Sequence, residues 1–288
     1  MKTIAWLGLG AMGQRMVAHL LEAGHDVVVY NRSQERAQAL LERGARLAAT
    51  PAEAASQAQV VVAMLTDDEA SKQVWSAPDT GAFAGVKPGT ILVESSTLTT
   101  EWIQQWATQA QTLEAYAVAA PVAGTTPQAE AGALIYFAGS TSAQALEDIE
   151  PVLLRMGQAV HKLPTPKHAA FVKLAVNSVF AAQICVLGEV LGAAQESGVA
   201  LQGLVDVLNQ VPVTSPALKG VSGLVLKDHR VSMFPIDLVE KDVRYMARAS
   251  SEALPCLNTV REQYDKARQQ GMGQENIHAV TRLHVRPE

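Results

Sequence analysis

Short apolar runs alternate with longer amphipathic stretches in the first half of the chain. The runs are nearly continuous in aliphatic residues, as in strands that are covered on both faces. They occupy residues 3–9, 25–31, 60–65, 90–96 and 115–122. Helical patterns over 11–24 and 33–44 follow the first two runs. This alternation of strand and helix predicts βαβ units that share a parallel sheet.

The pattern changes after about residue 163, where Pro164 and Pro166 interrupt the chain and no strong strand signal follows. The remaining residues have the periodicity of helices. Helices are predicted over about 167–197, 201–210, 216–227, 235–252 and 255–270. We therefore expect an α/β domain over residues 1–163 and an all-α domain over residues 164–288, joined by the long helix.

Composition and charge exclude several classes of partner. The 288 residues carry a formal charge of −5 without any block of lysine and arginine, so we expect no nucleic acid and no anionic membrane as a partner. The glycines of the N-terminal segment argue against a signal peptide. Polar residues interrupt the apolar run 169–194, which favours a buried helix of a soluble protein over a membrane span.

The cysteines and histidines do not indicate a metal site. Cys185 and Cys256 lack CxxC or metal-ligand spacing, so we expect neither a disulfide framework nor a metal, and a cytoplasmic location. His161 and His168 have no neighbouring carboxylate cluster, which favours surface or hinge positions over metal ligands. The acidic run 67–69 is interpreted as a solvated loop after the third strand.

A glycine motif follows the first predicted strand directly. Gly8, Gly10 and Gly13 form G-x-G-x-x-G at the start of a predicted helix. In this spacing the first glycine allows a tight turn, the second lets the backbone approach a pyrophosphate, and the third permits close helix packing. The strand, the motif, the helix and the next strand occur in this order, which raises the motif above a chance glycine-rich turn. The predicted dinucleotide-binding turn comprises Gly8, Leu9, Gly10, Ala11, Met12 and Gly13.

The end of the second predicted strand indicates which dinucleotide is bound. An acidic residue there would accept a hydrogen bond from the ribose 2′-hydroxyl of NAD, but this chain has Asn31, Arg32 and Ser33. Arg32 can pair with a 2′-phosphate, and the two neighbours can donate hydrogen bonds to it, so NADP(H) is favoured. The alternative interpretation is an exposed Arg32 at a helix start that Ser33 caps.

Six segments along the chain together resemble the β-hydroxyacid dehydrogenase family. This family includes 3-hydroxyisobutyrate dehydrogenases and glyoxylate or succinic semialdehyde reductases, and it is related to 6-phosphogluconate dehydrogenase. The segments are IAWLGLGAMG at the start, VVVAMLTD, VESST at 93–97, APVAGTTPQAEAG at 120–132, VKLAVN at 172–177 and FPIDLVEKDVRY at 234–245. The resemblance implies an α/β Rossmann-like N-terminal domain, a long interdomain helix, an all-α C-terminal domain and an active site in the cleft between the domains. It also implies a homodimer or a higher homo-oligomer.

The resemblance further implies roles for individual residues. Lys173 matches the catalytic lysine of the family and Asn177 its nearby partner. Met64 and Leu65 are implied to line the cofactor channel, and Lys241 to approach the cofactor from the second domain. The remaining implied residues are Thr97 near the nicotinamide, and Ser96, Ala123, Gly124 and Thr125 around the substrate.

Lys173 and Asn177 stand four residues apart and therefore on one face of the predicted helix. An ammonium group can stabilise the negative charge that develops on a carbonyl oxygen during reduction and can supply the proton. In the reverse direction a neutral amine, with a pKa lowered by burial or a nearby cation, accepts the proton. The alternative is a lysine that extends to solvent beside an asparagine that caps a backbone group. The residues alone leave both interpretations open, and the family motif favours catalysis.

The chain departs from the family pattern at the substrate motif. Family members commonly have a serine where this chain has Ala123, and a glycine pair where it has Lys167 and Ala169. Thr125 or Thr126 can partly replace the lost hydroxyl. A small carbonyl or hydroxy compound is therefore the expected substrate, with a weak or altered preference for hydroxyacids.

Two rival functions are considered. Imine reductases resemble this architecture, and ALIYFAGS at 133–140 is similar to them, but they commonly have an aspartate or a tyrosine in the place of Lys173. A nucleotide-binding sensor or scaffold without catalysis is the second rival. It has no need of the set Lys173, Asn177 and Lys241, although Lys241 beside Asp242 could also be an ordinary surface ion pair.

Overall fold

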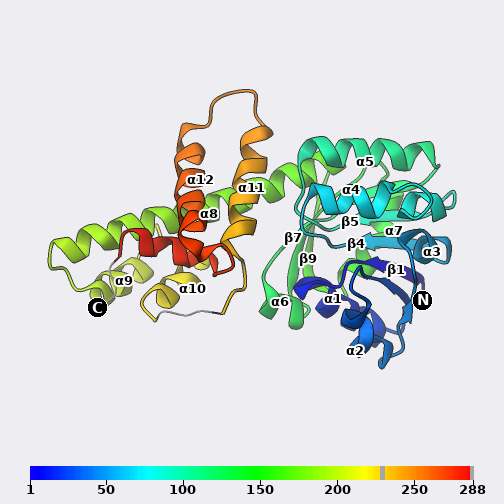
Figure 1. Cartoon of the computed structure of the whole chain (residues 1–288), viewed down its shortest axis with the longest axis horizontal. Coiled ribbons are helices and arrows are strands. Elements are labelled where there is room, and N and C mark those ends of the chain that lie inside the picture. Colours follow the sequence, from blue (N-terminus) through cyan, green and yellow to red (C-terminus); the bar gives the residue numbers. More distant parts are fainter. Residues whose placement is uncertain (228–230, 286–288) are drawn as a thin grey trace. The chain divides into compact units, whose positions relative to one another are not determined.

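The computed structural model describes residues 1–227 and 231–285. These residues form two compact units, of which the first is Met1–Lys173 and the second begins at Leu174 (Figure 1). The division falls inside helix α8 (Pro166–Glu196), whereas the sequence places the domain boundary before this helix. The two descriptions differ only in how they assign the first residues of α8.

A mixed sheet forms the centre of the first unit. In the part of the chain that the structure describes it has nine strands, in the order β3-β2-β1-β4-β5-β6-β8-β7, with β9 paired to β8. The parallel strands on one side are β1 (Thr3–Leu7), β2 (Asp26–Tyr30), β3 (Arg46–Leu47), β4 (Val60–Ala63), β5 (Ile91–Glu94) and β6 (Tyr116–Ala119). This is the strand order of the doubly wound dinucleotide-binding fold. Together with a helical second unit it confirms the predicted fold class.

Alternate residues of each strand enter different cores, which explains the continuous apolar runs. In β1, Ile4 and Trp6 pack on one face of the sheet, and Ala5 and Leu7 pack on the other. Helices α1 (Ala11–Glu22) and α7 (Ala143–Leu153) contribute to the first core, and α3 (Pro51–Ser56), α4 (Asp68–Ser76) and α5 (Thr100–Thr112) to the second (Figure 1). The side chains therefore meet apolar neighbours above and below the sheet.

Two parts of the first unit differ from the sequence prediction. No strands were predicted at β8 (Leu134–Gly139) and β9 (Gly157–Leu163), and the predicted run 115–122 reaches only the first residue of β7 (Val122–Ala123). Strand β8 runs antiparallel to β6 and β7 and parallel to β9. Most residues of β9 are exposed or half-buried, so its sequence lacks an apolar run. The helix predicted over 33–44 is a 3₁₀ turn, Gln34–Ala37, followed by one α-helical turn, α2 (Gln38–Leu41). Only Ala37 and Leu40 are buried there, too few to support a longer helix.

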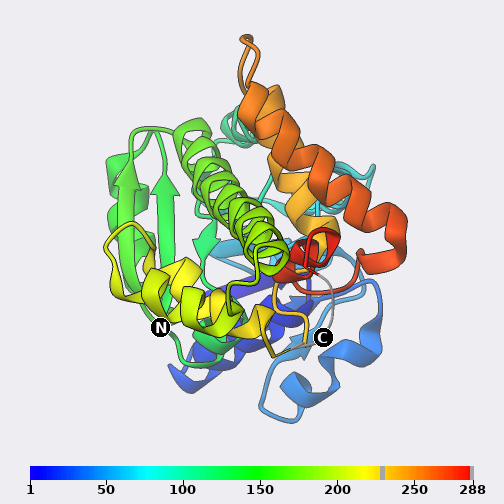
Figure 2. The same cartoon turned by 90° about the vertical axis from the view of Figure 1, so that its left-hand side faces the viewer.

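The second unit is helical throughout its described residues. After α8 it contains α9 (Leu201–Gln210), α10 (Pro216–Val225), α11 (Ile236–Arg248) and α12 (Pro255–Ala267), then a π-helical turn, Arg268–Met272, and a 3₁₀ segment, Ile277–Leu283. Helices α11 and α12 lie side by side (Figure 2). Gly188 of α8 lets the C-terminal segment approach closely, because a Cβ there would lie 3.0 Å from Thr281 Cα.

Helix α8 has one buried and one exposed apolar face. Ala181 and Ile184 are fully buried, whereas Val179 and Val186 are 59% and 58% exposed. It is the one helix in residues 1–227 and 231–285 whose length and hydropathy would allow it to cross a membrane, and half of its most apolar window is buried. Length and hydropathy alone do not distinguish a membrane span from the core helix of a soluble protein.

Candidate cofactor-binding and catalytic site

The glycine turn follows β1 and has no room for side chains at its first and third glycines. Gly8 has a φ of +105°, and a Cβ there would lie 2.4 Å from the carbonyl oxygen of Met64. A Cβ on Gly13 would lie 2.2 Å from the carbonyl oxygen of Gly8. Gly10 differs, because a Cβ there would meet nothing within 4 Å. The turn is thus closed on the protein side and open over Gly10.

The open side of the turn is the N-terminus of α1. Gly10 is the N-cap residue and provides no side-chain cap, and the first turn of the helix contains no acidic residue. The amide groups at this end carry the positive pole of the helix dipole and have no intrahelical acceptor. A cradle that is open over Gly10 and rich in amide donors fits the pyrophosphate of a dinucleotide.

Two side chains from neighbouring segments hold the turn in place. The indole nitrogen Nε1 of Trp6 donates to the carbonyl of Gly8 at 3.0 Å. The backbone N–H of Leu9 donates to Asn31 Oδ1 at 2.8 Å, and Asn31 Nδ2 donates to the carbonyl of Ser33 at 2.8 Å. Asn31 therefore supports the turn, and the adjacent Arg32 is exposed at the end of β2.

The other predicted cofactor and substrate residues follow neighbouring parallel strands. Because the carboxyl ends of β4, β5 and β6 meet at one edge of the sheet, the segments 64–65, 95–97 and 120–125 share this edge with the glycine turn. The backbone N–H of Leu65 donates to Ser96 Oγ at 2.7 Å, and Ser96 Oγ donates to Glu94 Oε1. The single hydroxyl proton of Ser96 is thus directed to Glu94 and not to the open edge of the sheet.

The substrate motif reaches the start of a short helix, α6 (Thr126–Glu130). Ala123 ends β7, and Gly124 has a φ of +125° that favours glycine. The hydroxyl and backbone N–H of Thr125 both bond to Gln128 Oε1 at 2.9 Å. The proton of the Thr125 hydroxyl is therefore directed to Gln128, which makes this hydroxyl a poor replacement for the serine hydroxyl that is missing at Ala123.

The acidic run 67–69 does not form the solvated loop that we predicted. Asp67 caps α4 by accepting from the backbone N–H of Ala70 at 2.8 Å. Asp68 accepts from the backbone N–H of Thr99 at 2.9 Å and from its Oγ1 at 2.6 Å. The run starts a helix, because aspartate is a strong N-cap residue, and it ties the segments after β4 and β5 together.

Lys173 and Asn177 are each only 7% exposed. They lie on the buried side of α8, away from the face that exposes Val179 and Val186. This burial disagrees with the alternative interpretation, in which the Lys173 side chain extends to solvent. Asn177 Nδ2 donates to Asp242 Oδ2 at 2.6 Å, which fixes the orientation of its amide group.

Lys241 and Asp242 are buried, so they are not an ordinary surface pair. They are 6% and 2% exposed, and Lys241 Nζ lies 3.2 Å from Asp242 Oδ1. The same ammonium group lies 5.2 Å from the ring centroid of Tyr245, a cation–π contact. Asp242 thus joins Lys241 to Asn177, a role that sequence reasoning missed. The available signal was its place in the apolar helix face between Val239 and Val243, both buried.

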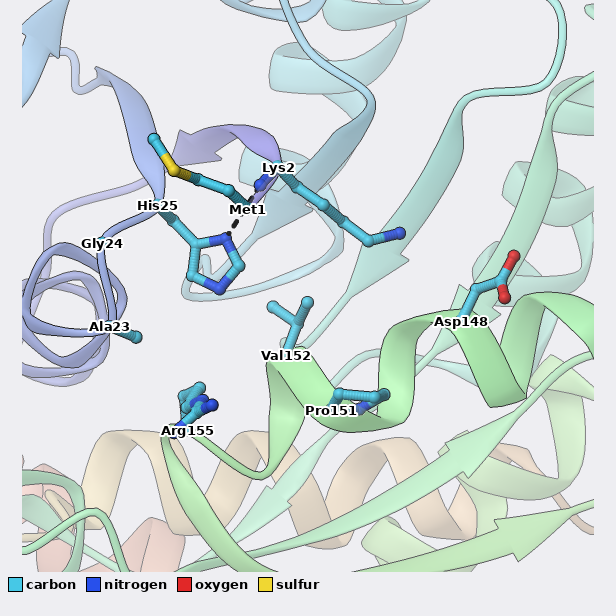
Figure 3. A pocket seen from close by; sticks show the side chains of 9 residues that line it. All are labelled: Met1, Lys2, Ala23, Gly24, His25, Asp148, Pro151, Val152 and Arg155. Atoms are coloured by element: carbon cyan, nitrogen blue, oxygen red, sulfur yellow. Dashed lines mark hydrogen bonds between the residues drawn. The ribbon is translucent and has the colours of Figure 1, made fainter.

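A surface hollow of about 340 Å³ lies elsewhere on the first unit (Figure 3). Lys2, His25 and Arg155 line it together with Asp148 and Pro151. It is located where β1 and β2 begin, at the edge of the sheet opposite to the glycine turn. Burial and the nearby cationic groups lower the pKa of His25. The hollow is not part of the candidate site.

Comparisons with known proteins agree with this organisation. The family model for the NAD binding domain of 6-phosphogluconate dehydrogenase matches residues 3–164, and that for the NAD-binding domain of NADP-dependent 3-hydroxyisobutyrate dehydrogenase matches residues 168–284. A solved structure of 3-hydroxyisobutyrate dehydrogenase from Salmonella typhimurium has a TM-score of 0.84 and 25% identity, and the match covers 98% of this chain and 99% of that one.

Two curated relatives match over nearly the whole chain. The cytokine-like nuclear factor N-PAC of Homo sapiens is 29% identical over 99% of this chain and 52% of its own length, so the chain spans about half of that relative. The chloroplastic glyoxylate/succinic semialdehyde reductase 2 of Arabidopsis thaliana is 29% identical over 96% of this chain and 78% of its own length. Because the first family model alone spans more than half of the 288 residues, this chain belongs to the β-hydroxyacid dehydrogenase family.

Proposed function

We propose that this protein is an NADP(H)-dependent oxidoreductase that interconverts a small carbonyl compound and the corresponding hydroxy compound. The observation that carries the proposal is a buried lysine, Lys173, in a chain that also holds an open dinucleotide cradle over Gly10. A buried lysine is uncommon in proteins and marks a candidate functional site. Membership of a dehydrogenase family supports the same activity.

In this proposal, different residues of the chain bind the cofactor and transfer the proton. The amide groups of Gly10, Ala11 and Met12 would bind the pyrophosphate at the N-terminus of α1. The bound cofactor supplies or accepts a hydride at its nicotinamide ring. Lys173 Nζ stabilises negative charge on the substrate oxygen and donates a proton to it, or accepts that proton in the reverse direction. Asn177, whose amide Asp242 orients, presents its carbonyl oxygen one helical turn from Lys173.

We propose NADP(H) rather than NAD(H) as the cofactor. Arg32 is exposed at the end of β2, where no carboxylate occupies the position that selects NAD. The family model that matches residues 168–284 describes an NADP-dependent enzyme, which supports the same preference.

Arg32→Ala is expected to weaken NADPH binding by roughly one to two orders of magnitude, because a hydrogen bond to a charged group is worth about 1.5–3 kcal/mol. Binding of NADH, which has no 2′-phosphate, is expected to change little. Fluorescence titration with NADPH and with NADH measures the ratio of the two dissociation constants. Arg36→Ala, at another exposed arginine of the same segment, is the matched control and should retain the preference for NADPH. An equal loss in both variants would refute a specific role for Arg32.

The substrate is proposed to be a small carbonyl compound that the protein does not recognise strongly through a carboxylate. Ala123 has no hydroxyl group, and the Thr125 hydroxyl donates to Gln128 Oε1. The assay that separates carbonyl reduction from imine reduction follows NADPH oxidation with glyoxylate, succinic semialdehyde and a cyclic imine. Turnover of the two aldehydes is expected. Turnover of the imine alone would favour imine reduction, and NADPH binding without any turnover would favour a sensor or scaffold.

We also propose that the protein is a cytoplasmic homodimer. Both cysteines are free, which suits a reducing compartment. The exposed valines of α8, Val179, Val186 and Val190, form an apolar stripe of the kind that oligomers bury. Sedimentation equilibrium of the full chain should give twice the mass of one chain, and a single-chain mass would rule the dimer out.

A further inference from the structure

Glu94 is the last residue of β5 and has no exposed surface. Its Oε2 accepts from Ser71 Oγ at 2.8 Å and from Trp75 Nε1 at 2.7 Å. Its Oε1 accepts from the backbone N–H of Ser96 at 3.0 Å and from Ser96 Oγ. A carboxylate has about four acceptor positions, so these four donors saturate it. Burial raises the pKa of Glu94, and the hydrogen bonds from Ser96, Ser71 and Trp75 oppose this shift.

The network has two arms that leave Glu94 in different directions. On the first arm Ser71 Oγ accepts from Trp102 Nε1 at 2.8 Å, which joins α4 to α5 within the core. On the second arm Ser96 Oγ accepts from the backbone N–H of Leu65 at 2.7 Å, which joins the segments after β5 and β4. Only the second arm leads toward the glycine turn.

The segment held by Ser96 packs directly against this turn. A Cβ built on Gly8 would lie 2.4 Å from the Met64 carbonyl oxygen and 2.8 Å from Leu65 Cδ2. Met64 also donates its backbone N–H to the carbonyl of Leu7 at 2.9 Å, one residue before the turn. The two segments pack closely, so a displacement of Leu65 must either displace the glycine turn or leave a cavity between Leu65 and the turn.

We propose that Glu94 is a positioning residue of the dinucleotide site, which acts through the Ser96 hydroxyl and the Leu65 backbone N–H on the glycine turn at Gly8. This inference rests on the proposed binding of NADP(H). A carboxylate is suited to the role because all four donors point at it. A glutamine would turn an NH₂ group toward two of them and break one arm.

The test compares the two arms by removing one serine hydroxyl from each. Ser96→Ala cuts the arm to the glycine turn and is expected to raise the Kd and the KM for NADPH about fivefold to tenfold. Ser71→Ala, the matched control, cuts the arm to Trp102 and should lower the melting temperature while leaving the Kd for NADPH unchanged. If the network has a purely structural role, both variants lose stability, and they do not differ from each other in the Kd or the KM for NADPH.

The dependence on Ser96 is tested by combining substitutions. If Glu94 acts through Ser96, the loss of NADPH affinity in Glu94→Gln should not exceed that in Ser96→Ala, and Glu94→Gln with Ser96→Ala should bind no more weakly than Ser96→Ala alone. If Glu94→Gln does not fold, the comparison of the two serine variants still decides the question.

Three outcomes would overturn the inference. A folded Ser96→Ala variant with the wild-type Kd, or an equal loss of affinity in Ser71→Ala, would show that the Ser96 arm does not act on the turn. In both cases the wild-type protein binds NADPH and the proposed function stands. A wild-type protein that does not bind NADPH would overturn the proposed function and this inference with it.

Discussion

Lys173→Ala is expected to lower turnover by about 10²- to 10⁴-fold while NADPH binding is largely retained, since general acid–base catalysis contributes on this scale. The lysine is 7% exposed and shares a helix face with Asn177, whose amide is held by Asp242 at 2.6 Å. In the proposed mechanism, alanine removes both the proton donor and the charge that stabilises the substrate oxygen. Steady-state kinetics with an aldehyde substrate and a nucleotide titration of the same preparation measure the two effects.

Two further substitutions separate the contributions of Lys173. Lys173→Arg keeps the positive charge, but a guanidinium does not exchange its proton near neutral pH, so it should restore charge stabilisation without proton transfer. Lys219→Ala, at an exposed lysine of α10, is the control and should leave turnover unchanged. Activity of Lys173→Ala equal to that of the wild type would exclude Lys173 as the general acid.

Gly13→Ala is expected to abolish NADPH binding and to destabilise the first unit. A Cβ at this position would lie 2.2 Å from the Gly8 carbonyl oxygen and 3.0 Å from Trp6 Nε1, which already bond to each other. The helix must then move away from β1, and overpacking of this kind costs about 1–3 kcal/mol of the free energy of unfolding. Chemical denaturation and a nucleotide titration measure the two losses.

Gly10→Ala separates binding from stability at the same turn. Its Cβ would meet nothing within 4 Å, so the free energy of unfolding should change little, yet the methyl group would project into the space proposed for the pyrophosphate. NADPH binding is therefore expected to weaken strongly in a stable protein. Wild-type affinity in this variant would place the pyrophosphate elsewhere.

The parts of the fold that were predicted well are those with a local signal. The strand β1, the glycine spacing and helix α1 follow one another within about one βαβ unit, so short-range chemistry is enough to specify them. Strand β9 was missed because its exposed residues carry no apolar pattern. The helix predicted over 33–44 was too long because periodicity does not show how few of its residues find a core.

The features of the candidate site likewise divide into those that the sequence determines locally and those that depend on the tertiary structure. The sequence by itself determined the glycine turn and the placement of Lys173 and Asn177 on one helix face, since both depend on spacings of a few residues. Only the tertiary structure decided that Asp242, remote in the chain, orients Asn177. It likewise decided that Glu94 saturates its carboxylate with donors from α4 and the segment after β5. The contacts of Asp242 with Asn177 and of Glu94 with α4 join residues that are distant in sequence, and burial and hydrogen bonding select them only once the chain has folded.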